Sequence, residues 1–132
     1  MKNRPGNTIS QHIADIWIDD EDIIWIVFNS TSTHTLDDAK QIVEAHNALA
    51  DHRPRAILAD LRKINVGANR SARKYYVSDE ASRLKLAMAM VTSSSIQRMA
   101  GNLFLKLSKP PYPARIFPDT PEAIRWLKTF RD

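Results

Sequence analysis

Hydrophobic residues occur along this chain both in continuous runs and in helically spaced stripes. Residues 23–28 (IIWIVF) and 55–61 (RAILADL) are apolar at nearly every position, which predicts strands that are covered on both faces. Residues 9–18 predict another strand. The acidic turn at 19–22 (DDED) joins it to residues 23–28, so these two strands are expected to form a hairpin.

Helical spacing marks the segments between and after these strands. Residues 36–50 predict a helix, with Thr35 and Asp38 as its N-terminal cap, and residues 52–54 (HRP) end it. A second helix is expected over 69–84. Residues 86–91 (LAMAMV) fit a strand or the tail of that helix, and the following TSSS favours the strand.

The clearest periodicity follows this strand. Ser94 and Gln97 form a capping-box pattern, and apolar residues then recur at i, i+3, i+4, i+7, i+8 and i+11. This stripe predicts a helix that packs on the core through Ile96, Met99, Ala100, Leu103, Phe104 and Leu107.

The last elements are a short strand at 114–117 and a helix at 121–130, for which residues 119–122 (DTPE) supply a cap, an early proline and a first-turn acid. The predicted order is β-β-α-β-α-β-α-β-α, which is typical of one α/β domain with a mixed, mainly parallel sheet. We expect a single domain over 1–132, preceded by a flexible tail at residues 1–8.

Composition excludes several classes of protein. The chain has no cysteine, so it can form neither a disulfide framework nor a thiolate metal site. The first ten residues lack the apolar core of a signal peptide, and no apolar run is long enough to span a membrane. These features predict a cytoplasmic protein, and we expect neither a metal nor a cofactor.

Charge is divided unevenly along the chain. Residues 1–52 carry three basic and nine acidic side chains, whereas residues 53–115 carry thirteen basic and three acidic ones. Such a division favours a positive surface that attracts acidic ligands or partners, and it also permits self-association with the acidic half.

The element order and three stretches resemble the STAS-like fold of the anti-sigma-factor antagonists, also called SpoIIAA-like. They also resemble the uncharacterised bacterial proteins that are grouped near this fold and near the lipid-binding CRAL-TRIO domains. The stretches are AILADLR (56–62), GNLFLKLSKP (101–110) and RIFPDTPEAIRWL (115–127). The resemblance implies a regulatory or protein-interaction module. In the antagonists, a partner kinase phosphorylates a serine in an Asp-Ser-Ser/Thr-Gly stretch. The corresponding residues 67–71 (GANRS) lack this pattern, so the resemblance does not extend to a phosphorylated Ser71.

The loops that follow parallel strands meet at one edge of the sheet, where α/β folds bind ligands. This carboxyl edge is expected to gather cations, hydroxyls and helix N-termini that favour an anion or an acidic partner. The candidate residues at this edge are Asp60, Arg62, Lys63, Asn69, Arg70, Ser71, Arg73 and Ser94. Helix capping alone also explains Asn69 and Ser94, and Asp60 fits either a functional acid or an acceptor for loop N–H groups.

Enzymatic chemistry finds little support in the sequence. The four histidines stand in no nucleophile or zinc motif, and His34 is expected to be an exposed loop residue at the carboxyl edge. A pocket that holds both Asp60 and His34 would indicate an enzyme. Residues 70–76 (RSARKYY) combine cations with aromatics, but no nucleic-acid motif is present, so nucleic acid is not the expected partner.

The helix that begins at residue 95 also has a polar face, where Arg98, Asn102 and Leu105 are candidate interface residues. The sequence therefore predicts a non-enzymatic binding module. We expect it to dock another protein or a second copy as a homodimer. The alternative is a carrier of a small anionic or lipidic ligand, held in a pocket beneath aliphatic helices.

Overall fold

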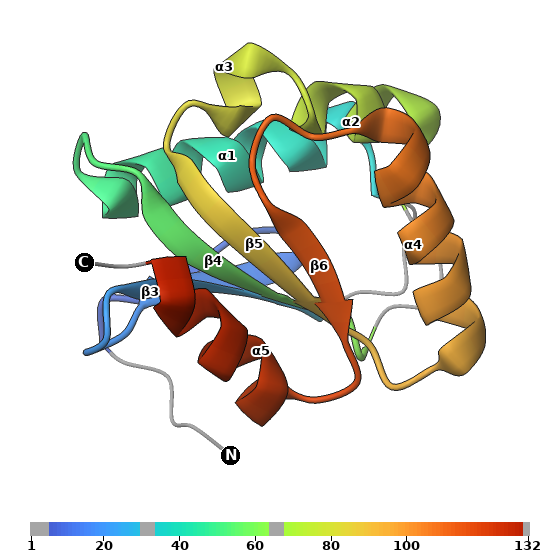
Figure 1. Ribbon diagram of the computed structural model, residues 1–132. Helices are drawn as coiled ribbons and strands as arrows, with labels where there is room; N and C mark the ends of the chain where they lie inside the picture. Colours follow the sequence, from blue (N-terminus) through green and yellow to red (C-terminus); the bar gives the residue numbers. More distant parts are fainter. Residues whose placement is uncertain (1–5, 30–33, 64–67, 131–132) are drawn as a thin grey trace.

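The computed structural model describes residues 6–29, 34–63 and 68–130, and its central feature is a six-stranded sheet (Figure 1). The strands lie in chain order: β1 (Ile9–Ser10), β2 (Ala14–Ile18), β3 (Ile23–Phe28), β4 (Arg55–Asp60), β5 (Lys85–Val91) and β6 (Ala114–Phe117). The first three strands pair antiparallel, and β3 to β6 pair parallel. This confirms the predicted mixed, mainly parallel α/β sheet.

The prediction of one continuous strand over residues 9–18 is wrong. The chain turns at 11–13, where the Gln11 N–H donates to the Ala14 carbonyl over 2.8 Å, and β1 pairs back on β2. The polar Ser10, Gln11 and His12 interrupt the apolar pattern at this turn. The expected tail at residues 1–8 lies partly outside the described residues.

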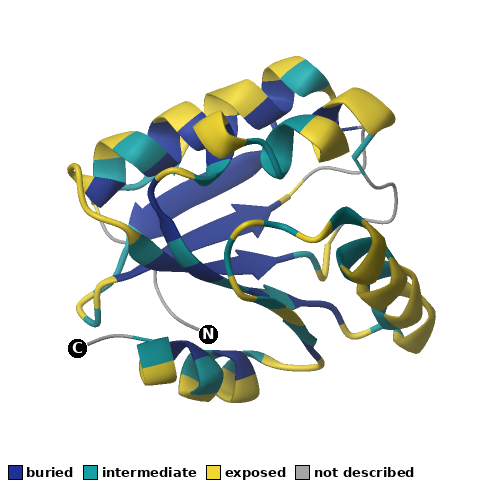
Figure 2. Ribbon diagram, turned by 45° about the horizontal axis from the view of Figure 1, so that its top comes forward, coloured by how far each residue is buried: buried dark blue, intermediate teal, exposed yellow. Residues whose placement is uncertain are grey.

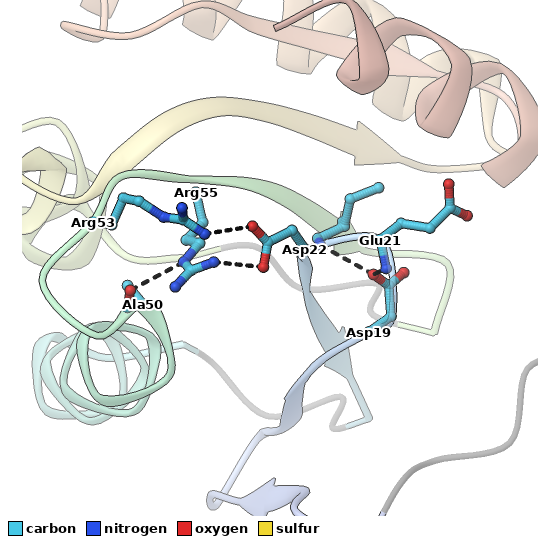
Figure 3. A network of polar contacts seen from close by, with 7 residues as sticks. Asp19, Glu21, Asp22, Ala50, Arg53 and Arg55 are labelled. Atoms are coloured by element: carbon cyan, nitrogen blue, oxygen red, sulfur yellow. Dashed lines mark hydrogen bonds and ion pairs between the residues drawn. The ribbon is translucent and has the colours of Figure 1, made fainter. Parts of the chain in front are cut away.

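The acidic turn between β2 and β3 forms the predicted hairpin. The Asp19 carboxylate accepts hydrogen bonds from the backbone N–H groups of Glu21 and Ile23 and from the Trp25 indole. Asp22 adopts φ 69° and forms ion pairs with two arginines, Arg53 in the turn before β4 and Arg55 at the start of β4 (Figure 3). Some charges of the acidic and basic halves of the chain thus neutralise each other within the molecule.

Five helices and a final 3₁₀ turn complete the described chain. They are α1 (Leu36–Ala50), α2 (Arg70–Tyr76), α3 (Asp79–Ser82), α4 (Ser95–Ser108), α5 (Thr120–Leu127) and η1 (Lys128–Phe130). Thr35 and Asp38 form the expected capping box of α1. The single helix predicted over 69–84 is wrong, because Ser78 starts a new helix by accepting a hydrogen bond from the Ala81 N–H.

Both faces of the sheet are covered, which explains why β3 is buried at every position. One core cluster lies beneath α1 and includes Ile24, Ile26 and Ile57. The other lies beneath α5 and includes Leu58, Val91 and Leu127. Figure 2 shows the buried strands between α1 above and α5 below.

Helix α4 departs from its prediction, because most of its apolar stripe faces solvent (Figure 2). Ile96, Met99, Leu103 and Leu107 are 78%, 73%, 59% and 74% exposed. The helix lies beside the edge strand β6 and contacts it at Gly101, where a Cβ would stand 2.4 Å from Ile116 Cδ1. Periodicity correctly predicted the helix, but it could not show which part of the apolar surface would contact the sheet.

Candidate ligand-binding cavity

A cavity of about 450 Å³ lies between α1, α2 and α4, over the sheet face that these helices flank. Ile26, Phe28, Ala59, Met88, Met90 and Ile116 form its floor. Its walls include Ile42, Val43 and His46 of α1, Tyr76 of α2, and Ala100, Phe104 and Leu105 of α4. We call this space the α1–α4 cavity. Its size and its mainly apolar lining are typical of small-molecule sites.

The cavity runs along β5. Lys85 begins this strand and Thr92 follows its last residue, and both line the cavity. At about 3.3 Å per residue, the two positions are separated by roughly 23 Å along the strand. Exposed Arg73, Gln97 and Ala100 also line it, so the cavity opens to solvent between α2 and α4. This geometry fits an elongated ligand.

His34 lies at the wall of the cavity, near the carboxyl edge. It is only 5% exposed, so the prediction of an exposed loop histidine is wrong. Its Nε2 atom is hydrogen-bonded to the Tyr76 hydroxyl, and its ring packs against Phe28 with centroids 5.4 Å apart. Burial lowers the pKa of His34 to about 4 and raises the pKa of Tyr76, so both side chains are neutral at pH 7.

Lys85 lies at the opposite, amino end of the sheet and is 7% exposed. Its Nζ atom is 5.2 Å from the centroid of the Tyr76 ring and 5.6 Å from that of the Tyr112 ring. Burial lowers the pKa of Lys85 to about 8 and raises the pKa of Tyr112 to about 12. The cavity therefore holds a buried ammonium group between two aromatic rings.

His46 of α1 contributes a second polar group to this lining. It is fully buried, and burial together with the nearby Lys85 charge lowers its pKa to about 4. Nδ1 is 3.1 Å from Asn47 Oδ1, whereas Nε2 is buried without a hydrogen-bond partner among the described residues. A buried polar atom of this kind is uncommon in native proteins.

Most of the predicted carboxyl-edge residues lie outside the cavity. Asp60 is buried at the end of β4 and accepts hydrogen bonds from Arg62 Nε and Nη2 over 2.9 and 2.7 Å, as well as from the Arg62 backbone N–H. This ion pair lowers the pKa of Asp60 despite its burial. Lys63 is exposed. The structure thus shows Asp60 as an acceptor for loop donors.

At the start of α2, Asn69 caps the helix by accepting from the Ala72 N–H over 2.9 Å. Arg70 and Ser71 are exposed, and Arg73 alone of this group lines the cavity. Ser94 caps α4. The predicted loop residues at 30–33 and 64–67 lie outside the described residues.

The three interface candidates on α4 do not share one surface. The Arg98 guanidinium donates to the Thr92 carbonyl over 3.0 Å, and Asn102 is exposed. Leu105 is half-buried and lines the cavity, so its prediction as an outward contact residue is wrong. The exposed apolar side of α4 is instead formed by Ile96, Met99, Leu103 and Leu107, which we call the outer α4 stripe.

Sequence reasoning missed Lys85, His46 and Tyr112. His46 had a usable signal, because it follows Ile42 and Val43 at helical spacing on the buried side of α1. Lys85 had no such signal, because a charged residue at the first position of an apolar strand is expected to be solvent-exposed. In the part of the chain that the structure describes, no three His, Asp or Glu side chains form a metal-binding group. No described helix has the length and apolarity to cross a membrane.

The strand order and the helices on both faces of the sheet define an α/β domain with a SpoIIAA-like fold. A crystal structure of an uncharacterised DUF3478-family protein with a SpoIIAA-like fold, from Shewanella loihica PV-4, superposes with a TM-score of 0.61. The alignment covers 96% of this chain and 98% of that one at 18% identity, which establishes a shared fold. Residues 16–131 match a domain family of unknown function, DUF7793, and the chain belongs to that family. A search of curated proteins finds no match.

Proposed function

We propose that this protein is a non-enzymatic, cytoplasmic binding module that takes a small, elongated and largely apolar ligand into the α1–α4 cavity. The cavity itself carries this proposal. It occupies about 450 Å³ over a floor that includes Met88 and Met90, two side chains that remain partly accessible on β5, the strand next to the edge strand β6. In a protein without a ligand role, α4 would be expected to bury its apolar stripe over these residues.

The polar groups around the cavity support binding without catalysis. His34 lines the cavity but is engaged by Tyr76, and Asp60 is absent from the lining and is held by Arg62. A nucleophile, a base and a group that orients the base need to lie within hydrogen-bond reach of one another. The described lining residues include no such arrangement.

The test uses decan-1-ol, a neutral ligand with one extended chain. Ala59 lies on the cavity floor and is 5% exposed, so Ala59→Phe fills the space that the ligand needs. Ala48→Phe is the matched control, because Ala48 is exposed on α1. Decan-1-ol is expected to raise the melting temperature of the wild type and of Ala48→Phe with concentration, but not that of Ala59→Phe. An unresponsive wild type, or a full response in Ala59→Phe, would refute the proposal.

A second candidate function is docking of another copy of the chain through the outer α4 stripe. Its residues follow the spacing i, i+3, i+7 and i+11, which two packed helices use at their interface. We expect Leu103→Asp to convert a dimer to a monomer in sedimentation analysis. Asn102→Asp adds the same charge to the neighbouring exposed position and is expected to leave the dimer intact. A monomeric wild type at high concentration would remove this candidate.

A further inference from the structure

The Lys85 ammonium group has aromatic neighbours but no counter-ion. Among the described residues it forms no ion pair and no hydrogen bond, and its contacts are the rings of Tyr76 and Tyr112. A buried charge is normally paired or hydrogen-bonded, because removing it from water costs several kcal/mol. The ammonium on the wall of this open cavity is therefore available to pair with an anionic ligand.

A local irregularity of the sheet turns Lys85 toward the cavity. Arg55 of β4 pairs with Lys85, but the next residue, Ala56, pairs with Ala87, so Leu86 is an extra residue in β5. Such a bulge re-aims the side chains before it. Lys85 therefore shares the cavity side with Met88 and not the side of Ala87, which belongs to the core beneath α5.

The groups that face Lys85 leave its charge available to a ligand. They are His46 of α1, Tyr76 of α2, and Tyr112 in the segment before β6. All three are neutral at pH 7, and with a pKa of about 8 Lys85 itself is about nine-tenths protonated. The partnerless Nε2 atom of His46 adds a second unsatisfied polar site to the same lining.

We propose that Lys85 binds the acidic group of an amphipathic anion whose apolar body fills the α1–α4 cavity. The inference rests on the proposed function and specifies the ligand class, a carboxylate on one extended hydrocarbon chain. A lone ammonium between two rings suits a singly charged carboxylate, whereas phosphate recognition commonly uses Arg forks or several backbone N–H groups. The anion site thus lies beside the Tyr76 and Tyr112 rings, on a residue that begins β5, and not on the predicted carboxyl-edge loop residues.

This placement also orients the ligand. With the carboxylate at Lys85, the chain extends beneath α4 toward Thr92 and the opening beside Arg73. A rival arrangement would reverse the ligand and place its carboxylate on the exposed Arg73 guanidinium. The two arrangements predict opposite effects of two charge-removing substitutions.

The experiment compares decanoate with decan-1-ol by isothermal titration at pH 7, in the wild type, Lys85→Met and Arg73→Met. The wild type is expected to bind decanoate more tightly than decan-1-ol. Lys85→Met is expected to lose about 10- to 100-fold of its decanoate affinity, the effect of removing a charged hydrogen bond, while it retains decan-1-ol binding. Arg73→Met is expected to change decanoate affinity less than threefold, on the scale of an exposed ion pair.

The outcomes separate this inference from the proposed function. If both ligands bind and Lys85→Met leaves decanoate affinity unchanged, the Lys85 site is refuted and the cavity function stands. If only Arg73→Met loses decanoate affinity, the ligand binds in the reversed orientation, and the Lys85 site is again refuted. If neither ligand binds the wild type, both proposals fail. Lys85→Gln provides the same comparison should the methionine variant not fold.

Discussion

Replacing Lys85 by methionine is expected to stabilise the ligand-free protein, although it removes the group that we propose for ligand binding. Methionine has nearly the length of the lysine stem, and it lacks the charge that burial disfavours. The side chain is 7% exposed and lies among the cavity's apolar residues and two tyrosine rings, where an apolar chain can pack in its place. Residues that serve binding at the expense of stability commonly behave in this way.

The size of the effect follows from the pKa of Lys85, which burial lowers from 10.5 to about 8. A tenfold change in proton affinity corresponds to about 1.4 kcal/mol. Protonated Lys85 therefore lowers the free energy of unfolding at pH 7 by about 3 kcal/mol. The two cation–π contacts offset about 1 kcal/mol of this. Lys85→Met should therefore gain about 2 kcal/mol at pH 7.

The pH dependence provides a sharper signature. Between about pH 8 and 10.5 the unfolded chain keeps the Lys85 proton while the folded protein has released it. The wild type should therefore become more stable as the pH rises, so the advantage of Lys85→Met shrinks by about 2 kcal/mol between pH 7 and 9.5. The raised pKa values of Tyr76 and Tyr112 act mainly above pH 10, and both proteins contain them.

Urea unfolding at pH 7 and 9.5 measures both quantities. Lys74→Met is the matched control, because it makes the same substitution at an exposed position. The reasoning is refuted if Lys85→Met is less stable than the wild type at pH 7. Parallel pH profiles for the two proteins would refute it equally.

Two further predictions concern groups away from Lys85. The folded-state pKa of His46 is lowered from 6.5 to about 4, so its contribution to stability is complete above pH 6.5 and is lost as the pH falls toward 4. When the pH is lowered from 7 to 5, the free energy of unfolding measured in urea should fall by about 2 kcal/mol less in His46→Leu than in the wild type. Equal decreases in the two proteins would contradict this prediction. The side chains of Arg53 and Arg55, both ion-paired with Asp22, are 64% and 12% exposed (Figure 3). Arg55→Ala should cost about 1–2 kcal/mol, because its Nε also donates to the Ala50 carbonyl, and Arg53→Ala less than about 0.5 kcal/mol. Equal losses of stability in the two variants would show that burial of the arginine does not determine the strength of its interactions.

The elements that the sequence predicted well are those whose signal is local. The strands at 23–28 and 55–60 are apolar because both of their faces are covered, and Thr35 with Asp38 defines the start of α1 through its own hydrogen bonds. The break at Ser78 also had a local signal, a serine followed by two acidic residues, but the helical pattern on both sides concealed it.

The candidate site depended on features with no local signal. The bulge at Leu86 decides the direction of Lys85, and it arises from the pairing of β5 with β4, which are separated by two helices in the chain. The sequence favoured a site at the carboxyl edge because open α/β sheets bind ligands outside the carboxyl ends of their strands. In this protein Asp60 and Arg62 instead satisfy each other, and the unpaired cation lies at the other end of β5.

Helix α4 explains how one sequence pattern can produce both the cavity and an exposed apolar surface. Its apolar residues extend from the outer α4 stripe to Phe104 and Leu105, so the apolar surface is wider than contact with a single edge strand requires. Phe104 and Leu105 face the cavity, whereas Met99 and Leu103 of the outer α4 stripe face solvent. If the outer stripe turned inward, it would fill the space above Met88 and Met90, and the polar residues beside it would become the solvent-facing side. Because α4 contacts β6 through Gly101 instead, the cavity remains and the stripe is left for a partner. The exposed stripe and the unfilled cavity are therefore two consequences of one helix position, although Leu103→Asp and Ala59→Phe test them separately.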